Sequence, residues 1–148
     1  MKKEGKYFDK ELGPLIYNPD LNWYDVLLDT KYGKVEVSLS CDEFERMEDF
    51  ISELRKFCNR IESVMAEAHL LIAEKMVPLK NESWLDENED PITREMLMDA
   101  IVPQGATINL SKGGLAEMFF DDGGFFEEHS IVVWHSEDGS VSDPHLAG

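Results

Sequence analysis

One apolar stripe constrains the fold of this 148-residue chain more than any other feature. Apolar side chains recur every three or four residues, the spacing of one face of an α-helix. The stripe consists of Phe44, Met47, Ile51, Leu54, Cys58, Ile61, Met65, Ala68 and Ile72. Ser40-Cys41-Asp42-Glu43 has the pattern of a capping box, so the helix is expected to begin near Cys41. Pro78 is expected to end it.

The length of this helix has consequences for the shape of the protein. A helix over residues 41–76 would be about 54 Å long, whereas a domain of this size has a radius of gyration of about 15 Å. The helix therefore either breaks, near Asn59, or extends beyond the sheet. The stripe can pack on the chain's own core, or an overhanging part can pair with a second copy as a structural homodimer.

Apolar and polar residues alternate with period two on both sides of the stripe, which predicts strands. The expected strands cover residues 15–17, 24–28, 35–39, 106–110, 115–120 and 130–135. Thr30-Lys31-Tyr32-Gly33 has the length of a hairpin turn. A short helix is expected from Pro91 to about Ile101. We predict an α+β fold with an antiparallel sheet, one long helix, continuous or broken, and one short helix. Residues 1–148 form one domain in this prediction, with residues 1–6 as a flexible tail.

Charge limits the classes of partner. Lys and Arg number 14 and Asp and Glu 31, which gives a net charge of −17. Such a charge repels phosphates and anionic lipids, so nucleic acids and membranes are disfavoured and a basic protein partner is favoured. Cys41 and Cys58 form no C-x-x-C pair, and the N-terminus lacks the apolar segment of a signal peptide. We therefore expect a cytoplasmic protein with reduced thiols.

Chemistry is most concentrated in the segment 119–134, where acids, glycines, phenylalanines and a histidine lie between two apolar runs. Asp and Gly also suit a plain hairpin turn, so this segment is either a site or only a connection. If it is a site, its acids contact Lys or Arg of a partner, with Phe125 or Phe126 as the apolar anchor. The candidate binding residues are Asp121, Asp122, Phe125, Phe126, Glu127, Glu128 and His129.

The main alternative for this segment is a metal-dependent hydrolase. Asp122 and His129 would hold the ion, and Glu127 or Glu128 would act as the base. The spacing matches neither an EF-hand loop nor an H-E-x-x-H motif. No G-x-S-x-G elbow, P-loop or G-x-G-x-x-G motif occurs in the chain. We therefore assign no catalytic residue, expect no cofactor, and favour a protein that is not an enzyme.

Several short motifs, taken in order, resemble a known family. They are Trp23, Asn81-x-x-Trp84, Phe120-Asp121-Asp122-Gly123-x-x-Phe126-x-x-His129-Ser130-Ile131 and Ala147-Gly148. From about Tyr7 to Gly148 the chain resembles an uncharacterised bacterial domain family of unknown function, family 2262. The resemblance implies a bacterial, stand-alone, cytoplasmic α+β domain without an established activity. The chain departs from the pattern at Gly124, where Asp is expected, and at Glu127-Glu128, where Trp-Gly is expected.

Small acidic α+β proteins are also similar, as a class, to the immunity proteins of bacterial toxin systems. Our leading hypothesis is therefore a non-enzymatic binding protein that acts as an immunity-type inhibitor of a basic toxin. The metal-dependent hydrolase and the structural homodimer are the alternatives. The first two hypotheses depend on where the tertiary structure places the acids of segment 119–134, and the homodimer depends on the long helix.

Overall fold

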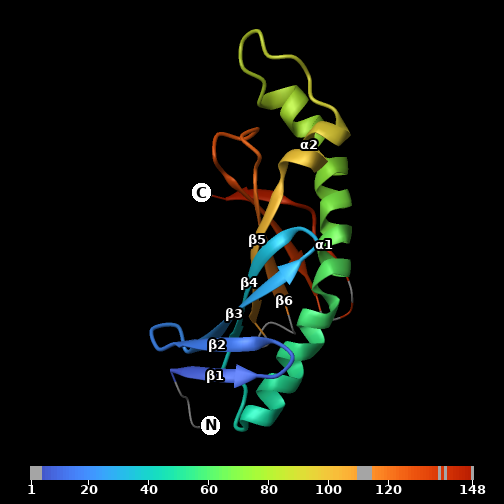
Figure 1. The fold of residues 1–148 in the computed structure, drawn as a ribbon. Coiled ribbons are helices and arrows are strands. Elements are labelled where there is room, and N and C mark those ends of the chain that lie inside the picture. Colours follow the sequence, from blue (N-terminus) through green and yellow to red (C-terminus); the bar gives the residue numbers. More distant parts are fainter. Residues whose placement is uncertain (1–4, 110–114, 137, 139, 148) are drawn as a thin grey trace.

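A computed structural model describes residues 5–109, 115–136, 138 and 140–147. Within these residues, an eight-stranded sheet forms one layer and a long helix, α1 (Met47–Ser83), the other (Figure 1). The strands lie side by side in chain order. They are β1 (Lys6–Asp9), β2 (Gly13–Asn18), β3 (Trp23–Thr30), β4 (Gly33–Ser40), β5 (Val102–Asn109), β6 (Leu115–Asp121), β7 (Ser130–His135) and β8 (His145–Ala147).

The expectation of an antiparallel sheet is wrong at one position. Strands β4 and β5 pair in parallel, with Glu36 opposite Gly105 and Leu39 opposite Ile108. The other neighbouring strands pair antiparallel. The reason is the crossover through α1, which returns the chain to the end of the sheet where β4 began, so β5 runs in the same direction. The fold is α+β with a mixed sheet.

Helix α1 is continuous over 37 residues and is about 55 Å long. It neither breaks near Asn59 nor extends unsupported, because its buried face runs from Phe50 to Lys80. The twisted sheet follows the helix, with β1 and β2 beside its first turns (Figure 1). The molecule is elongated, which resolves the conflict between helix length and domain size. The stripe that the homodimer alternative would use is packed on the chain's own sheet.

Both predicted ends of this helix are wrong. The helix begins at Met47, and the Ser40 hydroxyl accepts a hydrogen bond from the Asp42 N–H in a local turn (3.2 Å). Ser side chains favour such turns as readily as helix caps. At the other end, Pro78 lies inside the helix. The buried faces on either side of it, at Met76 and Lys80, hold the last turns against the rest of the protein.

The short helix, α2 (Arg94–Ala100), is capped by Thr93, whose hydroxyl accepts a hydrogen bond from the Met96 N–H (3.2 Å). Pro91 precedes it. Strands β1 and β8 were not expected, and β1 takes up Lys6 from the predicted tail; the rest of that tail, apart from Gly5, lies outside the described residues. None of the helices in the described part of the chain has the length and apolar character needed to cross a membrane.

Candidate functional site

The turn between β6 and β7 is wider than a tight hairpin, because it covers residues 122–129. Its backbone takes positive φ at Gly123 (65°), Gly124 (85°), Glu127 (54°) and Glu128 (65°). A Cβ on Gly123 would lie 2.6 Å from the Cβ of Ala100, so this position needs glycine. A residue other than glycine in this left-handed backbone conformation costs roughly 1–2 kcal/mol of conformational free energy. Contacts elsewhere in the turn must therefore stabilise the conformation of Glu127 and Glu128.

Asp122 supplies two of these contacts. Its side chain lies inside the turn and is only 4% exposed. One carboxylate oxygen accepts the Gly124 N–H (2.8 Å) and the other accepts the Phe126 N–H (2.9 Å). The carboxylate thus stabilises the turn from within, and the structure places Asp122 away from the surface at which we expected it to meet a partner.

The other two acids of the turn, Glu127 and Glu128, and Asp121 at the end of β6 are on the surface. Asp121, Glu127 and Glu128 are exposed. Asp121 accepts a hydrogen bond from the Gly123 N–H (2.8 Å). Among the described residues, no lysine or arginine forms an ion pair with any of the three. Their charges therefore face water without neutralisation by the described cations.

The aromatic residues of the turn join it to α1. Phe126 is buried and packs edge-on against Trp84, with ring centroids 5.8 Å apart. The His129 ring also contacts Trp84 (5.5 Å), and its Nδ1–H donates to the Phe126 carbonyl (2.6 Å). The motifs around Trp84 and around Phe126 thus meet in space. Phe126 is a core residue, whereas Phe125 and His129 are half-buried.

The loop between α1 and α2 is held over this turn by Lys80. The Lys80 side chain is 4% exposed, and its ammonium lies 2.6 Å from a Glu89 carboxylate oxygen and donates to the Trp84 carbonyl (2.7 Å). It also lies 6.0 Å from the Phe125 ring centroid. The hydrogen bond from Lys80 lowers the pKa of Glu89. The sequence analysis did not predict a role for Lys80, because it placed the end of the helix at Pro78. Lys80 lies four residues after Met76, so in a helix that continues past Pro78 the two residues share the buried face.

Asn81 closes the base of the same loop. Its side-chain oxygen accepts the Ile92 N–H (2.8 Å) and its amide donates to the Ile92 carbonyl (3.1 Å). The loop therefore starts and ends at one point, beside the turn. Together they form one end of the molecule, which we call the acidic end. Besides Glu89, which pairs with Lys80, its exposed acids include Asp86, Glu87, Asp90, Glu95, Asp99, Asp121, Glu127 and Glu128.

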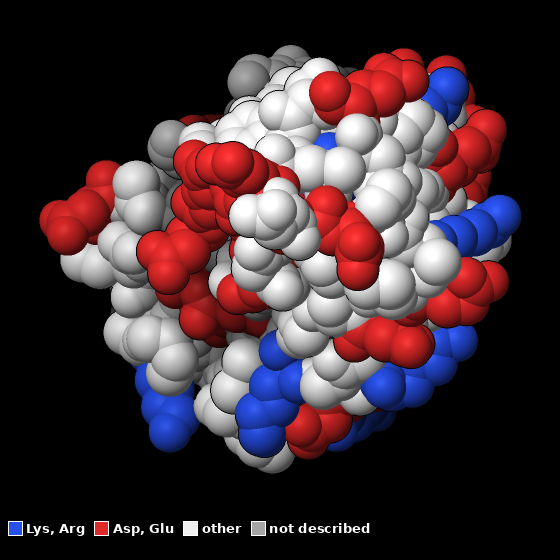
Figure 2. All heavy atoms as spheres, turned by 90° about the horizontal axis from the view of Figure 1, so that it is seen from above, with Lys and Arg blue, Asp and Glu red and all other residues white. Residues whose placement is uncertain are grey.

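Figure 2 looks down on this end and shows carboxylate side chains spread over it, with Lys and Arg gathered toward the edge of the view. Arg94 is the exposed base of α2. A polar hollow of about 300 Å³ opens beside the turn. It brings together four of the predicted residues, Asp121, Asp122, Glu128 and His129, with Gln104, Gly124 and Ser130. Phe125, Phe126 and Glu127 do not line it.

The hollow offers hydrogen-bond acceptors to a cationic group. Each Asp122 carboxylate oxygen accepts a backbone N–H, and the His129 Nδ1–H donates to the Phe126 carbonyl, so Nε2 is the His129 nitrogen left for a ligand. Within the described residues, no three His, Cys, Asp or Glu side chains are grouped so as to hold a metal. The arrangement suits binding of an ammonium or guanidinium group.

The fold and the acidic end define a class: small acidic α+β proteins in which a mixed sheet packs on one long helix. The chain belongs to a bacterial family described as "Uncharacterized protein conserved in bacteria (DUF2262)", whose family model matches residues 9–146. This confirms the resemblance expected from the order of the motifs. Searches of the curated proteins and of the solved structures each find no match.

Proposed function

We propose that this protein is a non-enzymatic binding protein whose acidic end binds a basic protein, in the way that an immunity-type inhibitor binds a toxin. The observation that supports this most is the set of outward carboxylates at Asp121, Glu127 and Glu128, which form no ion pair with the described lysines and arginines. The net charge of −17 acts in the same direction. Complementary charge accelerates the encounter of two proteins and disfavours acidic competitors.

The acidic end is also preorganised for binding. Asp122 holds the turn from inside, and Trp84 packs on Phe126 beneath it. The carboxylates of Glu127 and Glu128 thus project from a backbone that is already ordered, so binding costs less conformational entropy than with a loose loop. Exposed apolar groups lie nearby on Met96 and on Val102, which is opposite Asp121 in the sheet. An apolar centre with a charged rim is the usual composition of a protein interface.

Surface plasmon resonance against purified products of neighbouring genes tests the proposal. A basic product is expected to bind the immobilised protein at a rate that falls steeply with salt. Replacing Asp121→Asn, Glu127→Gln and Glu128→Gln together should lower the association rate at least about tenfold at low salt. The matched control is Glu43→Gln, Glu45→Gln and Asp49→Asn, which removes the same charge near the start of α1.

The immunity-type role has its own readout. Co-expression of the wild-type protein should restore growth to cells that express a toxic basic partner, and the acidic-end variant should not. Binding that is indifferent to salt, or equal for the two triple variants, would contradict the proposal. No contact among the described residues favours the hydrolase alternative, which stays a prediction.

A further inference from the structure

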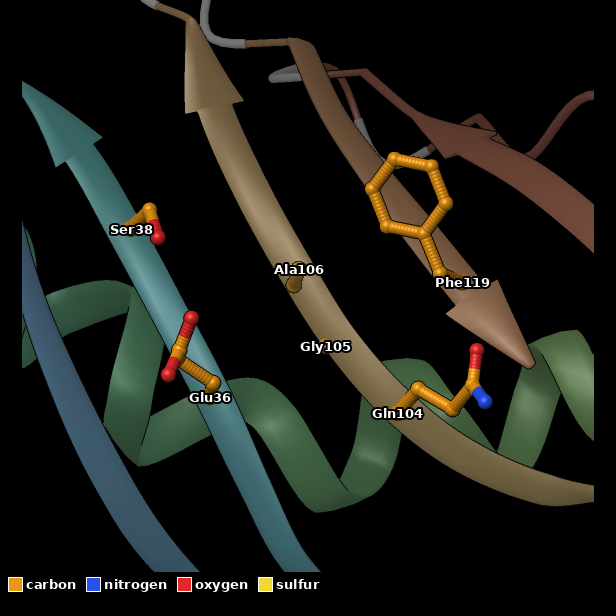
Figure 3. A pocket seen from close by; sticks show the side chains of 6 residues that line it. All are labelled: Glu36, Ser38, Gln104, Gly105, Ala106 and Phe119. Atoms are coloured by element: carbon orange, nitrogen blue, oxygen red, sulfur yellow. The ribbon is translucent and has the colours of Figure 1, made fainter. Parts of the chain in front are cut away.

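A second hollow lies on the face of the sheet that α1 leaves uncovered. It has a volume of about 250 Å³. Figure 3 shows Glu36, Gln104 and Phe119 projecting on the side of the sheet away from the helix. The lining residues come from three adjacent strands, β4, β5 and β6: Glu36, Ser38, Gln104, Gly105, Ala106 and Phe119.

Gly105 creates this hollow. It stands between Glu36 on β4 and Phe119 on β6, in register with both. A Cβ at this position would lie 2.9 Å from the Glu36 carbonyl oxygen, so the parallel strands can approach only because the residue is glycine. The missing side chain leaves a gap with a carboxylate on one side and an aromatic ring on the other. A register shift between Pro103 and Gly105 adds a β-bulge, and bulges redirect side chains such as Gln104.

The surface around the hollow is mixed: Asp25, whose carboxylate accepts a hydrogen bond from the Ser38 hydroxyl, lies on it together with exposed apolar side chains. Leu27 lies opposite Glu36 and is 57% exposed. Further along the same face, Ile16 is 47% exposed and Phe8 is 71% exposed. These residues alternate along their strands with inward side chains such as Leu15. The three exposed apolar side chains share one face of neighbouring strands, with Asp25 and Lys6 opposite Ile16.

The hollow carries a negative charge on Glu36 that the described cations do not neutralise. Glu36 is exposed and forms no ion pair with the lysines and arginines that the structure describes. Lys34, two residues earlier on β4, is paired with Asp29 (3.1 Å). The Glu36 carboxylate, which has the exposed Leu27 beside it and forms no ion pair with the described lysines and arginines, complements a cation that is carried next to apolar residues. This charge also argues against a second copy of the same chain, which would bring a like charge to it.

We propose that this hollow receives an arginine side chain from an apolar segment of the basic partner, an inference that rests on the proposed function. The guanidinium group binds the Glu36 carboxylate through two N–H groups, and its plane stacks on the Phe119 ring. The Gln104 side-chain oxygen accepts a further N–H. Apolar residues beside the arginine cover Leu27. Arginine suits the hollow better than lysine because only its planar group pairs with a carboxylate and a ring together.

Gln104 connects the hollow to the acidic end, because it lines both this hollow and the one beside Asp121. The two depressions are therefore neighbours on one surface. The partner's footprint extends from the acidic end onto the open face of the sheet, with salt-dependent contacts at the first and an arginine anchor at the second.

NMR titration of the isolated protein with N-acetyl-arginine methylamide tests the anchor directly. Saturable shifts are expected at the Gly105 amide and the Phe119 ring, and only weak shifts with the uncharged citrulline analogue. Glu36→Gln should weaken binding about tenfold, because one charge-assisted contact is lost. Phe119→Leu should weaken both the arginine shifts and their preference over N-acetyl-lysine methylamide. The control is Glu74→Gln, a matched change at an exposed position of α1, which should alter nothing.

Shifts that spread evenly over exposed acids, or that persist in Glu36→Gln, would overturn the anchor. The result is independent of the partner. If arginine binds the hollow but no basic protein binds the acidic end, the proposed function fails alone. If a basic protein binds through the acidic end and Glu36→Gln leaves its affinity unchanged, the anchor fails alone.

Discussion

Asp121 and Asp122 are adjacent aspartates for which the structure predicts opposite consequences of substitution by alanine. Asp122 is buried and accepts the N–H groups of Gly124 and Phe126. Asp121 is exposed and accepts one N–H, from Gly123. Asp122→Ala should therefore reduce the stability of the protein, whereas Asp121→Ala should reduce only the binding of a basic partner.

The size of the effect follows from the burial of the groups left behind. A hydrogen bond to a charged group contributes about 1.5–3 kcal/mol. Gly124 is exposed, so water can replace its bond to Asp122, but Phe126 is buried and its N–H would stay unpaired. We expect Asp122→Ala to lower the free energy of unfolding by about 2–4 kcal/mol. Asp121→Ala should change it by about 0.5 kcal/mol, as is usual for a surface position.

Urea unfolding followed by tryptophan fluorescence measures this difference. With an m-value of about 2 kcal/mol/M, the midpoint for Asp122→Ala should fall by about 1–2 M. Hydrogen exchange of the Phe126 amide should accelerate in the same variant. Equal midpoints for the two variants, or a loss below about 1 kcal/mol for Asp122→Ala, would refute the role of Asp122 as the internal support of the turn.

Three further predictions concern the rest of the structure. Burial raises the pKa of the Cys58 thiol to about 12. Alkylation of Cys58 by iodoacetamide at pH 8 should therefore be about a thousandfold slower in the native protein than in urea, as followed by mass spectrometry. Similar rates in the two conditions would contradict this. Burial lowers the pKa of His69 and of His135 below the ordinary value. The unfolded chain therefore takes up protons first, and these groups should reduce stability as the pH falls below about 6.5, by up to about 1.4 kcal/mol per pH unit each. In urea titrations at pH 7.5 and 5.5, His69→Gln should lose less stability than the wild type, and an equal loss would count against this assignment. Pro78 is exposed and lies inside α1. Because Pro78→Ala restores a backbone hydrogen bond, it should raise the free energy of unfolding by about 1–3 kcal/mol in urea titrations. A lower urea midpoint for this variant would show that the fold needs proline at this position.

Local patterns predicted the local elements well. The hairpin of β3 and β4 turns between Thr30 and Gly33, as its length and glycine indicated. The stripe from Met47 to Ile72 lies on one helix, because a repeat of three and four residues matches the helical period, and Phe44 lies just before the helix. The ends of the helix were missed, since Ser40 caps a turn and Pro78 is tolerated where both sides are packed.

The candidate site was predicted as a region but not as a geometry. Asp121 and Asp122 have the same side chain and adjacent positions, yet one faces water and the other the turn interior. Periodicity cannot assign directions within an irregular turn whose φ angles change sign. Lys80 and Glu89 were missed because their ion pair depends on a loop that closes through Asn81.

By itself, the sequence determined the two helices and six of the strands as elements, the strong negative charge, and the family to which the chain belongs. Helices and strands depend on residues near one another in the chain, the net charge is a sum over residues, and the family follows from the order of short motifs. The tertiary structure decided the parallel pairing of β4 with β5, the inward position of Asp122, and the meeting of Trp84 with Phe126. The parallel pairing and the contact of Trp84 with Phe126 depend on how the long crossover helix returns the chain to the sheet, whereas the position of Asp122 depends on the irregular backbone of the turn. The path of the chain through this crossover is set by packing between residues that are distant in the sequence, so a local sequence pattern does not predict it.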